Sequence, residues 1–353
     1  MSDLNPGETS DAAAAANYLA HVNRYARGVV EGSVDGLLSE IATEPLVTPG
    51  KGVRARMLSA VGDVLNVESW RLVPAAAACE LLHNASLIHD DVQDGDTVRR
   101  GEPTVWARHG VAQAINAGDL LLMNAVTALD TPLYAPALRW SLARACMRRS
   151  SSTVGGQALE LALSKHADIP PSLPLYIRAA LGKTGHFFAL PVELAALVAG
   201  LPDDTAEQLG DAALGLGVVY QIADDLLDLY GDKGRGAPGN DVREGKFSVL
   251  VAIHLERRPA DRAWLVPLLR KSRDETTGAD VERVATAFIS SDAVRLSAQR
   301  AADLLDVLGS EPRLNDFPAV RHVLESVGGQ ILRPLSSLIG LLAGAPVTER
   351  LAR

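Results

Sequence analysis

Aromatic side chains are scarce in this 353-residue sequence. Phe, Trp and Tyr together make up 4% of the residues, whereas apolar residues make up 47%. A core of this composition must be built mainly from aliphatic side chains, and Ala and Leu dominate them. Ala and straight-chain residues lose little conformational entropy in a helix, and no alternating strand pattern persists along the chain. The sequence therefore predicts an all-α protein.

Cysteine and net positive charge are also scarce. The two cysteines, Cys79 and Cys146, cannot form a disulfide framework, so we expect free thiols in the core of a cytoplasmic protein. Lys and Arg total 34 against 43 Asp and Glu, which gives a formal net charge of −9. Nucleic-acid binding depends on clustered cations that neutralise phosphates, so the composition argues against a nucleic-acid partner. Any affinity for phosphate must come from a local site.

Long apolar runs are absent as well. No window offers the roughly 18 consecutive apolar residues that a membrane span requires. The most apolar stretch, residues 187–202, is interrupted by Pro191 and Glu193. The first residues include Asp3 and Glu8 but no basic group, which argues against a signal peptide. The sequence predicts neither a transmembrane segment nor an export signal.

Helical apolar spacing covers most of the chain, with Pro and Gly at the breaks. Residues 1–12 are expected to form a disordered tail, and residues 13–353 a single helical domain. One helix is predicted to begin at Pro74, because proline suits the first turn of a helix. Helices are predicted over residues 74–93, 112–129, 136–163, 173–199, 205–230 and 241–256, and loops over 95–104 and 231–240.

Two Asp-Asp-x-x-Asp clusters follow apolar helix faces, and each precedes a glycine. The members are Asp90, Asp91 and Asp94 in the first cluster, and Asp224, Asp225 and Asp228 in the second. Residues i and i+4 share a helix face, so the carboxylates of each cluster repel one another. They are also repelled by the partial negative charge of the macrodipole at the helix C-terminus. One cluster alone is equally compatible with a solvated acidic helix end. Two clusters favour a bound cation, and hard carboxylate oxygens suit Mg²⁺ shared with substrate phosphates.

Basic residues stand at several predicted turns. Arg99 and Arg100 follow the first cluster, and Lys183 precedes Thr184 in the segment LGKTGHFF. Lys51 and Arg54 lie in GKGVRAR, and Lys246 lies in NDVREGKFS. Guanidinium and ammonium groups bind diphosphates, arginine through planar bidentate contacts. Acidic clusters together with such cations indicate a site for diphosphates bridged by Mg²⁺.

These segments resemble the trans-isoprenyl diphosphate synthase (polyprenyl synthetase) family. The segment LLHNASLIHDDVQD with the following RRG is similar to the family's first aspartate-rich motif, and YQIADDLLD to its second. NDVREGK and GKT also match, in the family's order. The resemblance implies a bundle of largely antiparallel helices around a deep central cavity, of the isoprenoid synthase type, and a homodimer. It also implies an Mg²⁺-dependent enzyme that joins isopentenyl diphosphate head to tail to an allylic diphosphate.

The resemblance assigns a role to each matching residue. Asp90, Asp94 and Asp224 would ligate Mg²⁺ on the allylic diphosphate, supported by Asp91, Asp225, Asp228 and Asp241. Arg99, Lys183, Lys246 and Gln221 would hold the allylic diphosphate, while Lys51, Arg54, His83 and Arg100 would hold isopentenyl diphosphate. Thr184 would face the reacting carbons, and Lys183, Thr184 and Arg99 would join the three metal-binding aspartates as catalytic residues. The allylic cation would be attacked by the isopentenyl double bond, and the departing diphosphate would take the proton.

The sequence departs from the family's pattern at two places. In the first basic motif, Gly52 stands where the family has arginine, and Ala55 where it has proline. The loop 231–240 lacks the family's lysine, for which Lys233 or Arg235 could substitute. Isopentenyl diphosphate binding is expected to survive the first change, because Lys51 and Arg54 keep their spacing.

Small side chains precede the first cluster by one helical turn. In the family these positions form the floor of the cavity that receives the growing chain, and here they are Ala85 and Ser86, with Leu82 one turn further back. The resemblance therefore implies a product longer than farnesyl diphosphate, geranylgeranyl diphosphate or beyond. Alternatively, both could be ordinary packing residues, with another helix closing the cavity.

Two other functions remain open from the sequence. A terpene cyclase or irregular prenyltransferase could use the same scaffold, although the second cluster is all aspartate and aromatic side chains are few. A non-catalytic regulatory subunit of a heteromeric synthase is the other alternative. Such a subunit is expected to have lost aspartates from its clusters, whereas this chain keeps all six.

Overall fold

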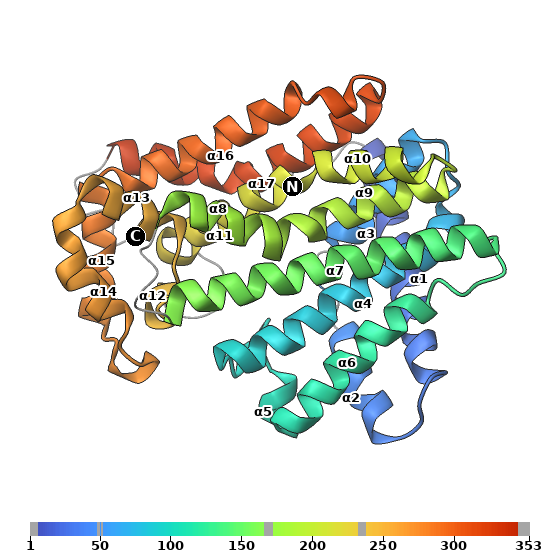
Figure 1. Cartoon of the computed structure of the whole chain (residues 1–353), viewed down its shortest axis with the longest axis horizontal. Coiled ribbons are helices and arrows are strands. Elements are labelled where there is room, and N and C mark those ends of the chain that lie inside the picture. The colour runs from blue at the N-terminus through green and yellow to red at the C-terminus, as the bar shows by residue number, and fades with distance from the viewer. Residues whose placement is uncertain (1–5, 48–49, 51, 166–171, 232–237, 345–353) are drawn as a thin grey trace. The chain divides into compact units, whose positions relative to one another are not determined.

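The computed structural model describes residues 6–47, 50, 52–165, 172–231 and 238–344. The described residues are almost entirely helical (Figure 1), and two strands of two residues each form the only sheet among them. The prediction of an all-α protein is confirmed. Among the described residues, no helix has the length and apolar character needed to span a membrane.

The chain divides into two compact units. Unit 1 comprises Met1–Ser150 and Phe187–Asp211, and unit 2 comprises Ser151–His186 and Ala212–Arg353. The single domain expected over residues 13–353 stays a prediction. The expected tail differs from the structure, because helix α1 begins at Pro6.

Helix α4 (Ser69–Asp94) is the centre of unit 1. It packs against α1 (Pro6–Glu31), α3 (Val53–Val64) and α6 (Val111–Thr127), and Figure 1 shows α4 beside α6. Four consecutive alanines, Ala75 to Ala78, have no exposed surface, so this part of α4 is enclosed on all sides. The remaining elements are α2 (Leu37–Val47), β1 (Val98–Arg99), β2 (Glu102–Pro103), α5 (Val105–His109), the first half of α7 (Pro136–Lys165), α9 (His186–Val198) and α10 (Asp203–Ala212).

A buried ion-pair network joins three helices of unit 1. Arg149 on α7 is only 1% exposed, and its guanidinium lies 2.8 Å from Glu193 on α9 and 2.6 Å from Asp211 on α10. Arg148 adds a second contact to Glu193 at 2.6 Å. Removing one partner from such a pair leaves an uncompensated buried charge, so the network constrains how these helices pack.

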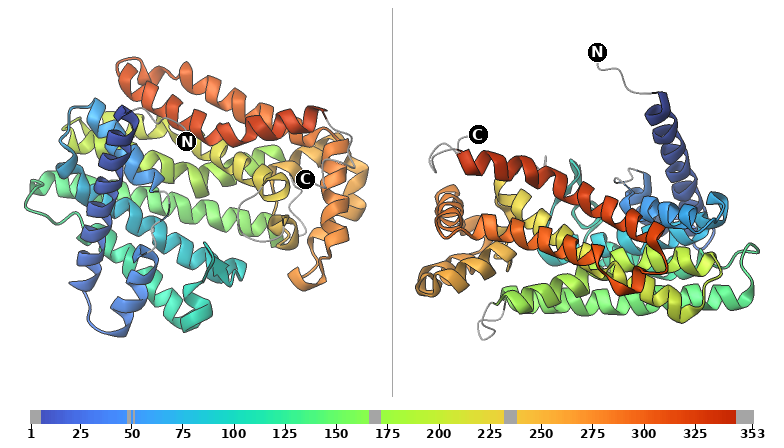
Figure 2. Two further views of the ribbon diagram at one scale, coloured as in Figure 1. Left: turned by 180° about the vertical axis from the view of Figure 1, so that it is seen from behind. Right: turned by 90° about the horizontal axis from the view of Figure 1, so that it is seen from above.

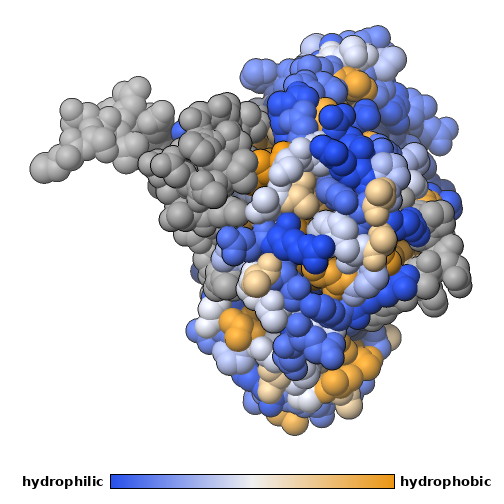
Figure 3. All heavy atoms as spheres, turned by 90° about the vertical axis from the view of Figure 1, so that its left-hand side faces the viewer, coloured by the Kyte–Doolittle hydropathy of each residue, from blue (hydrophilic) through white to orange (hydrophobic). Residues whose placement is uncertain are grey.

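Helix α11 (Leu214–Tyr230) is the centre of unit 2. It packs against α13 (Val249–Arg257), α16 (Ala293–Gly309) and α17 (Pro318–Gly344), and the last two run side by side (Figure 2). The surface on the side of α14 and α15 is mostly hydrophilic, with apolar residues in small groups (Figure 3). The other elements are the second half of α7, α8 (Leu173–Ala180), the π-helical turn η1 (Leu181–Gly185), α12 (Asn240–Arg243), η2 (Pro259–Asp261), α14 (Arg262–Leu269), η3 (Arg273–Glu275), α15 (Gly278–Ser290) and η4 (Pro312–Leu314).

Several predicted boundaries were wrong. Helix α4 begins at Ser69, and Pro74 lies inside it rather than in the first turn. The predicted helix 205–230 is two helices, because α10 ends at Ala212 and α11 begins at Leu214. The predicted helix 241–256 is also two, since α12 ends at Arg243 and α13 begins at Val249.

Both cysteines are free and buried, as predicted. Cys79 is 1% exposed and Cys146 has no exposed surface. Burial raises the pKa of the Cys79 thiol well above its ordinary value and that of Cys146 to about 12. Both sulfurs are therefore protonated packing groups in unit 1.

Candidate active site

The first aspartate cluster ends helix α4, as the sequence predicts. Asp94 is the last helical residue, and Gly95 caps the helix in the left-handed conformation with φ of 73°. Asp90 and Asp94 are one turn apart on the same helix face, and both are partly exposed. The macrodipole adds negative potential at this end, so the two carboxylates form a site that attracts a cation.

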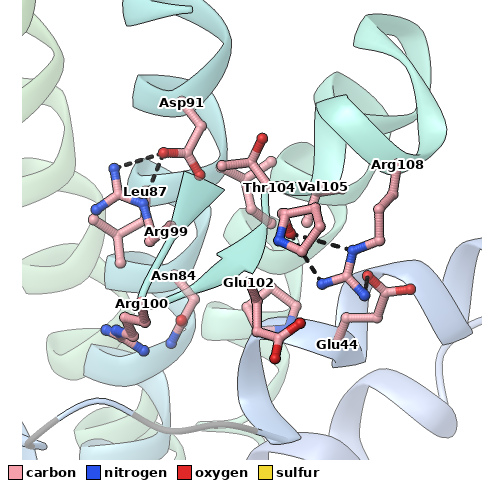
Figure 4. A pocket seen from close by; sticks show the side chains of 13 residues that line it. Glu44, Asn84, Leu87, Asp91, Arg99, Arg100, Glu102, Thr104, Val105 and Arg108 are labelled. Atoms are coloured by element: carbon pink, nitrogen blue, oxygen red, sulfur yellow. Dashed lines mark hydrogen bonds and ion pairs between the residues drawn. The ribbon is translucent and has the colours of Figure 1, made fainter. Parts of the chain in front are cut away.

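The middle aspartate of this cluster has a different environment. The Asp91 Oδ1 atom accepts a hydrogen bond from Arg99 Nε at 2.7 Å and lies 2.6 Å from Arg99 Nη2. Asp91 is only 4% exposed, and burial raises the pKa of its carboxyl. Figure 4 shows the Asp91 side chain turned toward the Arg99 guanidinium. In this structure Asp91 orients Arg99.

A cavity of about 90 Å³ adjoins this pair in unit 1. Arg100 and Asn84 lie near one another in it, and Arg108 on α5 contacts Glu44 on α2 at 3.5 Å (Figure 4). Cations and carboxylates thus both line its wall. The full lining consists of Glu44, Pro45, Asn84, Leu87, Ile88, Asp91, Arg99, Arg100, Glu102, Pro103, Thr104, Val105 and Arg108.

Two of the predicted isopentenyl-binding residues, Arg54 and Arg100, lie near a third, His83. The His83 ring is partly buried, and its desolvation together with the charges of Arg54, Arg100 and Arg99 holds its pKa well below the ordinary value. His83 meets the Phe187 ring edge-on at 5.8 Å, and the Arg54 guanidinium lies 5.1 Å from the same ring. The result is a cationic cluster with a neutral imidazole, which suits a multiply charged anion.

Glu80 supports this cluster, although the sequence analysis did not identify it. Its Oε1 atom accepts a hydrogen bond from the Ala55 backbone N–H at 3.3 Å. Ala55 stands in the first turn of α3, whose N-cap residue, Gly52, provides no side-chain cap. Burial raises the pKa of Glu80, and the nearby Arg54 opposes that rise. Glu80 thus fixes the helix turn that carries Arg54.

The backbone conformation and close surroundings of Gly52 explain why glycine stands where the family has arginine. Its φ is 59°, in the left-handed region, and a Cβ there would lie 2.6 Å from Leu19 Cδ2. A larger residue would therefore meet both backbone strain and the side chain from α1. Lys51, Lys233 and Arg235 lie outside the described residues.

The second cluster lies near the end of α11 in unit 2. Asp225 is 4% exposed, and its two oxygens accept hydrogen bonds from Gln221 Nε2 at 3.0 Å and the Val249 N–H at 2.9 Å. Burial raises the pKa of Asp225 to about 7, although these hydrogen bonds oppose the rise. Asp224 is partly exposed. As in the first cluster, the middle aspartate serves as an internal acceptor.

The last aspartate of the second cluster holds the NDVREGK segment. Asp228 Oδ2 accepts a hydrogen bond from the Asp241 N–H at 3.0 Å. Lys246 Nζ lies 2.7 Å from Glu244 Oε2 and 3.8 Å from Asp241 Oδ1. A small cavity of about 10 Å³ is lined by Asp225, Asp228, Asp241 and Lys246, among others. Unit 2 therefore brings these four predicted site residues together.

Lys183 and Thr184 lie on the π-helical turn η1. Thr184 is buried, and its hydroxyl donates a hydrogen bond to Gln221 Oε1 at 3.1 Å. Lys183 Nζ lies 2.7 Å from Glu160 Oε2 on α7, and both side chains are 20% exposed. Glu160 was not predicted, although it lies one helical turn after the glycine pair 155–156.

The predicted chain-length residues belong to the buried part of α4. Ala85 and Leu82 are 0% and 1% exposed. Ser86 is partly exposed, and its hydroxyl donates a hydrogen bond to the His83 carbonyl at 2.8 Å. Of the two positions closest to the cluster, only Ser86 has an accessible side chain.

The donor sets of the two clusters fit Mg²⁺. Asp90 and Asp94, and separately Asp224, offer partly exposed carboxylates at negative helix ends. Within the described part of the chain, no group of three or more His, Cys, Asp or Glu side chains is arranged to hold a metal. Mg²⁺ does not require one, because it is usually bound through one or two carboxylates together with waters and substrate phosphates.

Comparisons with known proteins show which proteins the whole chain is similar to. The profile of the family described as Polyprenyl synthetase matches residues 35–288. A geranylgeranyl diphosphate synthase from Saccharolobus solfataricus is 34% identical over 251 residues, which cover 70% of this chain and 74% of that protein. A geranylgeranyl diphosphate synthase from Mycobacterium tuberculosis is 35% identical over 260 residues, 72% of each chain.

A solved structure also shares the fold. The polyprenyl synthase from Caulobacter crescentus, complexed with calcium and isoprenyl diphosphate, superposes with a TM-score of 0.77 at 28% identity. The match covers 90% of this chain and 95% of the other. The predicted isoprenoid synthase type of fold is thereby confirmed.

Proposed function

Because this chain belongs to the polyprenyl synthetase family, we propose that it is a prenyltransferase that makes linear polyprenyl diphosphates. It joins isopentenyl diphosphate head to tail to an allylic diphosphate. The observation that carries this proposal is the division of roles repeated in both aspartate clusters. In each, a buried middle aspartate orders the surrounding chain, while the first aspartate stays partly exposed.

The metal is proposed to be Mg²⁺, held by Asp90, Asp94 and Asp224. Bound Mg²⁺ would neutralise the charge that develops on the departing diphosphate. The Caulobacter crescentus polyprenyl synthase was solved in complex with calcium and isoprenyl diphosphate, which supports binding of both a divalent cation and a diphosphate. Asp91, Asp225, Asp228 and Asp241 are proposed to act as supporting residues. The argument for this assignment is that the first three already accept hydrogen bonds from the protein.

The allylic diphosphate is proposed to bind Arg99, Lys183 and Lys246. Each of these cations is oriented by a carboxylate, respectively Asp91, Glu160 and Glu244. Preorganised cations stabilise developing negative charge without having to reorganise during the reaction. The C–O bond to the diphosphate breaks, and the leaving group later takes the proton lost from the condensed product. Gln221 is proposed to assist by orienting Thr184.

Isopentenyl diphosphate is proposed to bind Arg54, His83 and Arg100, together with Lys51. The lowered pKa of His83 keeps the imidazole neutral, so it can donate one hydrogen bond to a phosphate oxygen. The two arginines supply the charge. Because no positive charge is needed on His83, binding is expected to persist at alkaline pH.

The product is proposed to be geranylgeranyl diphosphate. The named activity of both relatives supports this length. The small, partly exposed side chain of Ser86 is consistent with it, because it leaves room that a phenylalanine would fill, whereas Ala85 is fully buried.

A homodimer in the cytoplasm is proposed as the working form. Large apolar side chains stand exposed on unit 1, among them Met123 on α6 and Trp140 on α7, each 69% exposed. Burial of these side chains against a second copy would remove apolar surface from water. Light scattering on Trp140→Glu should report a shift from dimer to monomer, whereas an unchanged mass would exclude Trp140 from the dimer interface.

The test of function is product analysis. Purified protein is incubated with Mg²⁺, isopentenyl diphosphate and, in separate reactions, dimethylallyl, geranyl or farnesyl diphosphate, and products are identified by mass spectrometry. Linear diphosphates ending at geranylgeranyl diphosphate are expected. Cyclic or irregular products without consumption of isopentenyl diphosphate would instead identify a cyclase. No turnover by the chain alone would identify a subunit that needs a partner.

A further inference from the structure

The turn that carries Lys183 and Thr184 is a π-helix, η1, inserted between α8 and α9. A π turn holds one residue more than an α-helical turn, is rare, and frequently marks a functional site. An α-helix would be the default continuation of the flanking helices. The surroundings must therefore favour the π form, and the contacts of η1 in unit 2 show how.

Helix α7 contacts η1 through a glycine. A Cβ on Gly156 would lie 2.0 Å from the Lys183 backbone nitrogen and 2.6 Å from the Gly182 Cα. These are backbone atoms, so no side-chain movement could relieve the overlap. One turn further along α7, Glu160 reaches the Lys183 ammonium at 2.7 Å. Helix α7 thus fixes Lys183 at both its backbone and its charged end.

Helix α11 contacts the opposite part of η1 in the same way. A Cβ on Gly217 would lie 2.4 Å from the Gly185 Cα and 2.6 Å from the Thr184 carbonyl carbon. One turn later, Gln221 accepts a hydrogen bond from the Thr184 hydroxyl at 3.1 Å. After another turn, Asp225 holds Gln221 at 3.0 Å. Thr184 is therefore also fixed at both backbone and side chain.

We propose that Gly156 and Gly217 are positioning residues that clamp the π turn, so that Lys183 and Thr184 are presented to the allylic substrate. The inference rests on the proposed function, because it assigns these two side chains to that substrate. Each clamping helix combines a glycine with a polar residue four positions later, Glu160 or Gln221. A side chain on either glycine would displace the π turn while leaving the polar partner intact.

The chain offers matched controls on the same two helices. Gly155 on α7 and Gly215 on α11 have no atom within 4 Å of a built Cβ. Gly155→Ala and Gly215→Ala therefore add the same methyl group without touching η1. The test measures steady-state kinetics of Gly156→Ala, Gly217→Ala and both controls, with circular dichroism and thermal melting to confirm folding.

Both clamp variants are expected to lose about 100-fold in kcat/KM for the allylic diphosphate, the effect of a misplacement near 1 Å. Their KM for isopentenyl diphosphate should stay at the wild-type value, since Arg54, His83 and Arg100 belong to unit 1. The controls should match the wild type in both constants. A loss of general stability would not produce this split between the two substrates.

Clamp variants that behave like their controls would overturn the proposal, as would equal losses toward both substrates. If neither clamp variant folds, native-state hydrogen exchange on the wild type decides. Amides of residues 182–185 should then exchange as slowly as those of α8 and α9, and fast exchange would refute the clamp. A wild-type protein without turnover would overturn the proposed function, and the exchange measurement would still decide the clamp.

Discussion

Asp91 and Asp90 are neighbours in the first cluster, yet the structure predicts different consequences when each loses its charge. Asp91 Oδ1 receives both contacts from Arg99, at 2.7 and 2.6 Å, and its side chain is 5% exposed. Asp91→Asn keeps the shape and one acceptor oxygen. It therefore replaces a hydrogen bond between two ionised groups, worth about 1.5–3 kcal/mol, with a weaker one in which only the guanidinium is charged.

The expected loss is the difference, about 1–2 kcal/mol. Arg99 is 21% exposed, so water can partly solvate a guanidinium that has lost its partner. At about 1.4 kcal/mol per factor of ten, kcat/KM for the allylic diphosphate should fall roughly 5- to 30-fold. The Mg²⁺ concentration that gives half-maximal rate should change far less than on loss of a direct ligand, because Asp91 is proposed to support the site through Arg99 rather than to ligate the metal.

The assay is a Mg²⁺ titration of initial rates for the wild type, Asp91→Asn and Asp90→Asn. Asp90→Asn should raise the half-saturating Mg²⁺ concentration, since it removes a proposed ligand. The reasoning is refuted if Asp91→Asn shifts that concentration as far as Asp90→Asn does. Equal kcat/KM for Asp91→Asn and the wild type would also contradict it.

Three further outcomes are expected. Gly52→Ala should lower the free energy of unfolding in urea by about 1–2 kcal/mol from the left-handed backbone alone. Adding Leu19→Ala to this variant should restore only the share of stability lost to the 2.6 Å contact between the new Cβ and Leu19. An unchanged urea midpoint for Gly52→Ala alone would exclude backbone strain. Ser86→Phe and Ala85→Phe should both shorten the product as seen by mass spectrometry. Ala85→Phe should also lower the melting temperature more than Ser86→Phe does, because only the side chain of Ser86 has accessible space. An unaltered product spectrum in both variants would show that these residues do not form the cavity floor. The free energy of unfolding should fall as the pH drops below about 6.5, because His83 then binds a proton in the unfolded chain but stays neutral in the fold, where its pKa is lowered. The slope is at most about 1.4 kcal/mol per pH unit. His83→Gln should remove that share of the slope in denaturation curves measured from pH 7 to pH 5, and an identical slope would show that His83 titrates normally in the fold.

Local signals in the sequence were sufficient for the ends of α4 and α11. Each has apolar spacing up to an aspartate cluster and a glycine at the C-cap, Gly95 or Gly231, so the position of the carboxylates was predictable. The break between α10 and α11 was not, because residues 205–230 contain no proline and keep a helical pattern throughout. The break at Ala213 therefore depends on tertiary packing, which overrides local propensity.

The site shows the same division. The family resemblance predicted Arg99 as a diphosphate ligand, but not its pairing with Asp91, which requires the chain to turn back between the end of α4 and β1. The π turn was also hidden, because Gly156 and Gly217 stabilise it from helices distant in sequence. The N-cap residue of α3 is a glycine, which has no side chain to cap the helix. Glu80 could have been found only by asking which other side chain accepts a hydrogen bond from the first turn of α3.

The burial of both thiols has a practical consequence for labelling. Alkylating reagents attack the thiolate, and Cys79 and Cys146 are inaccessible and protonated in the folded protein. A cysteine placed at an exposed position such as Gly155 would thus be the sole sulfur to react with a maleimide dye under native conditions. Fluorescent probes can therefore be attached to a chosen helix while both native cysteines, and the packing they provide, are retained.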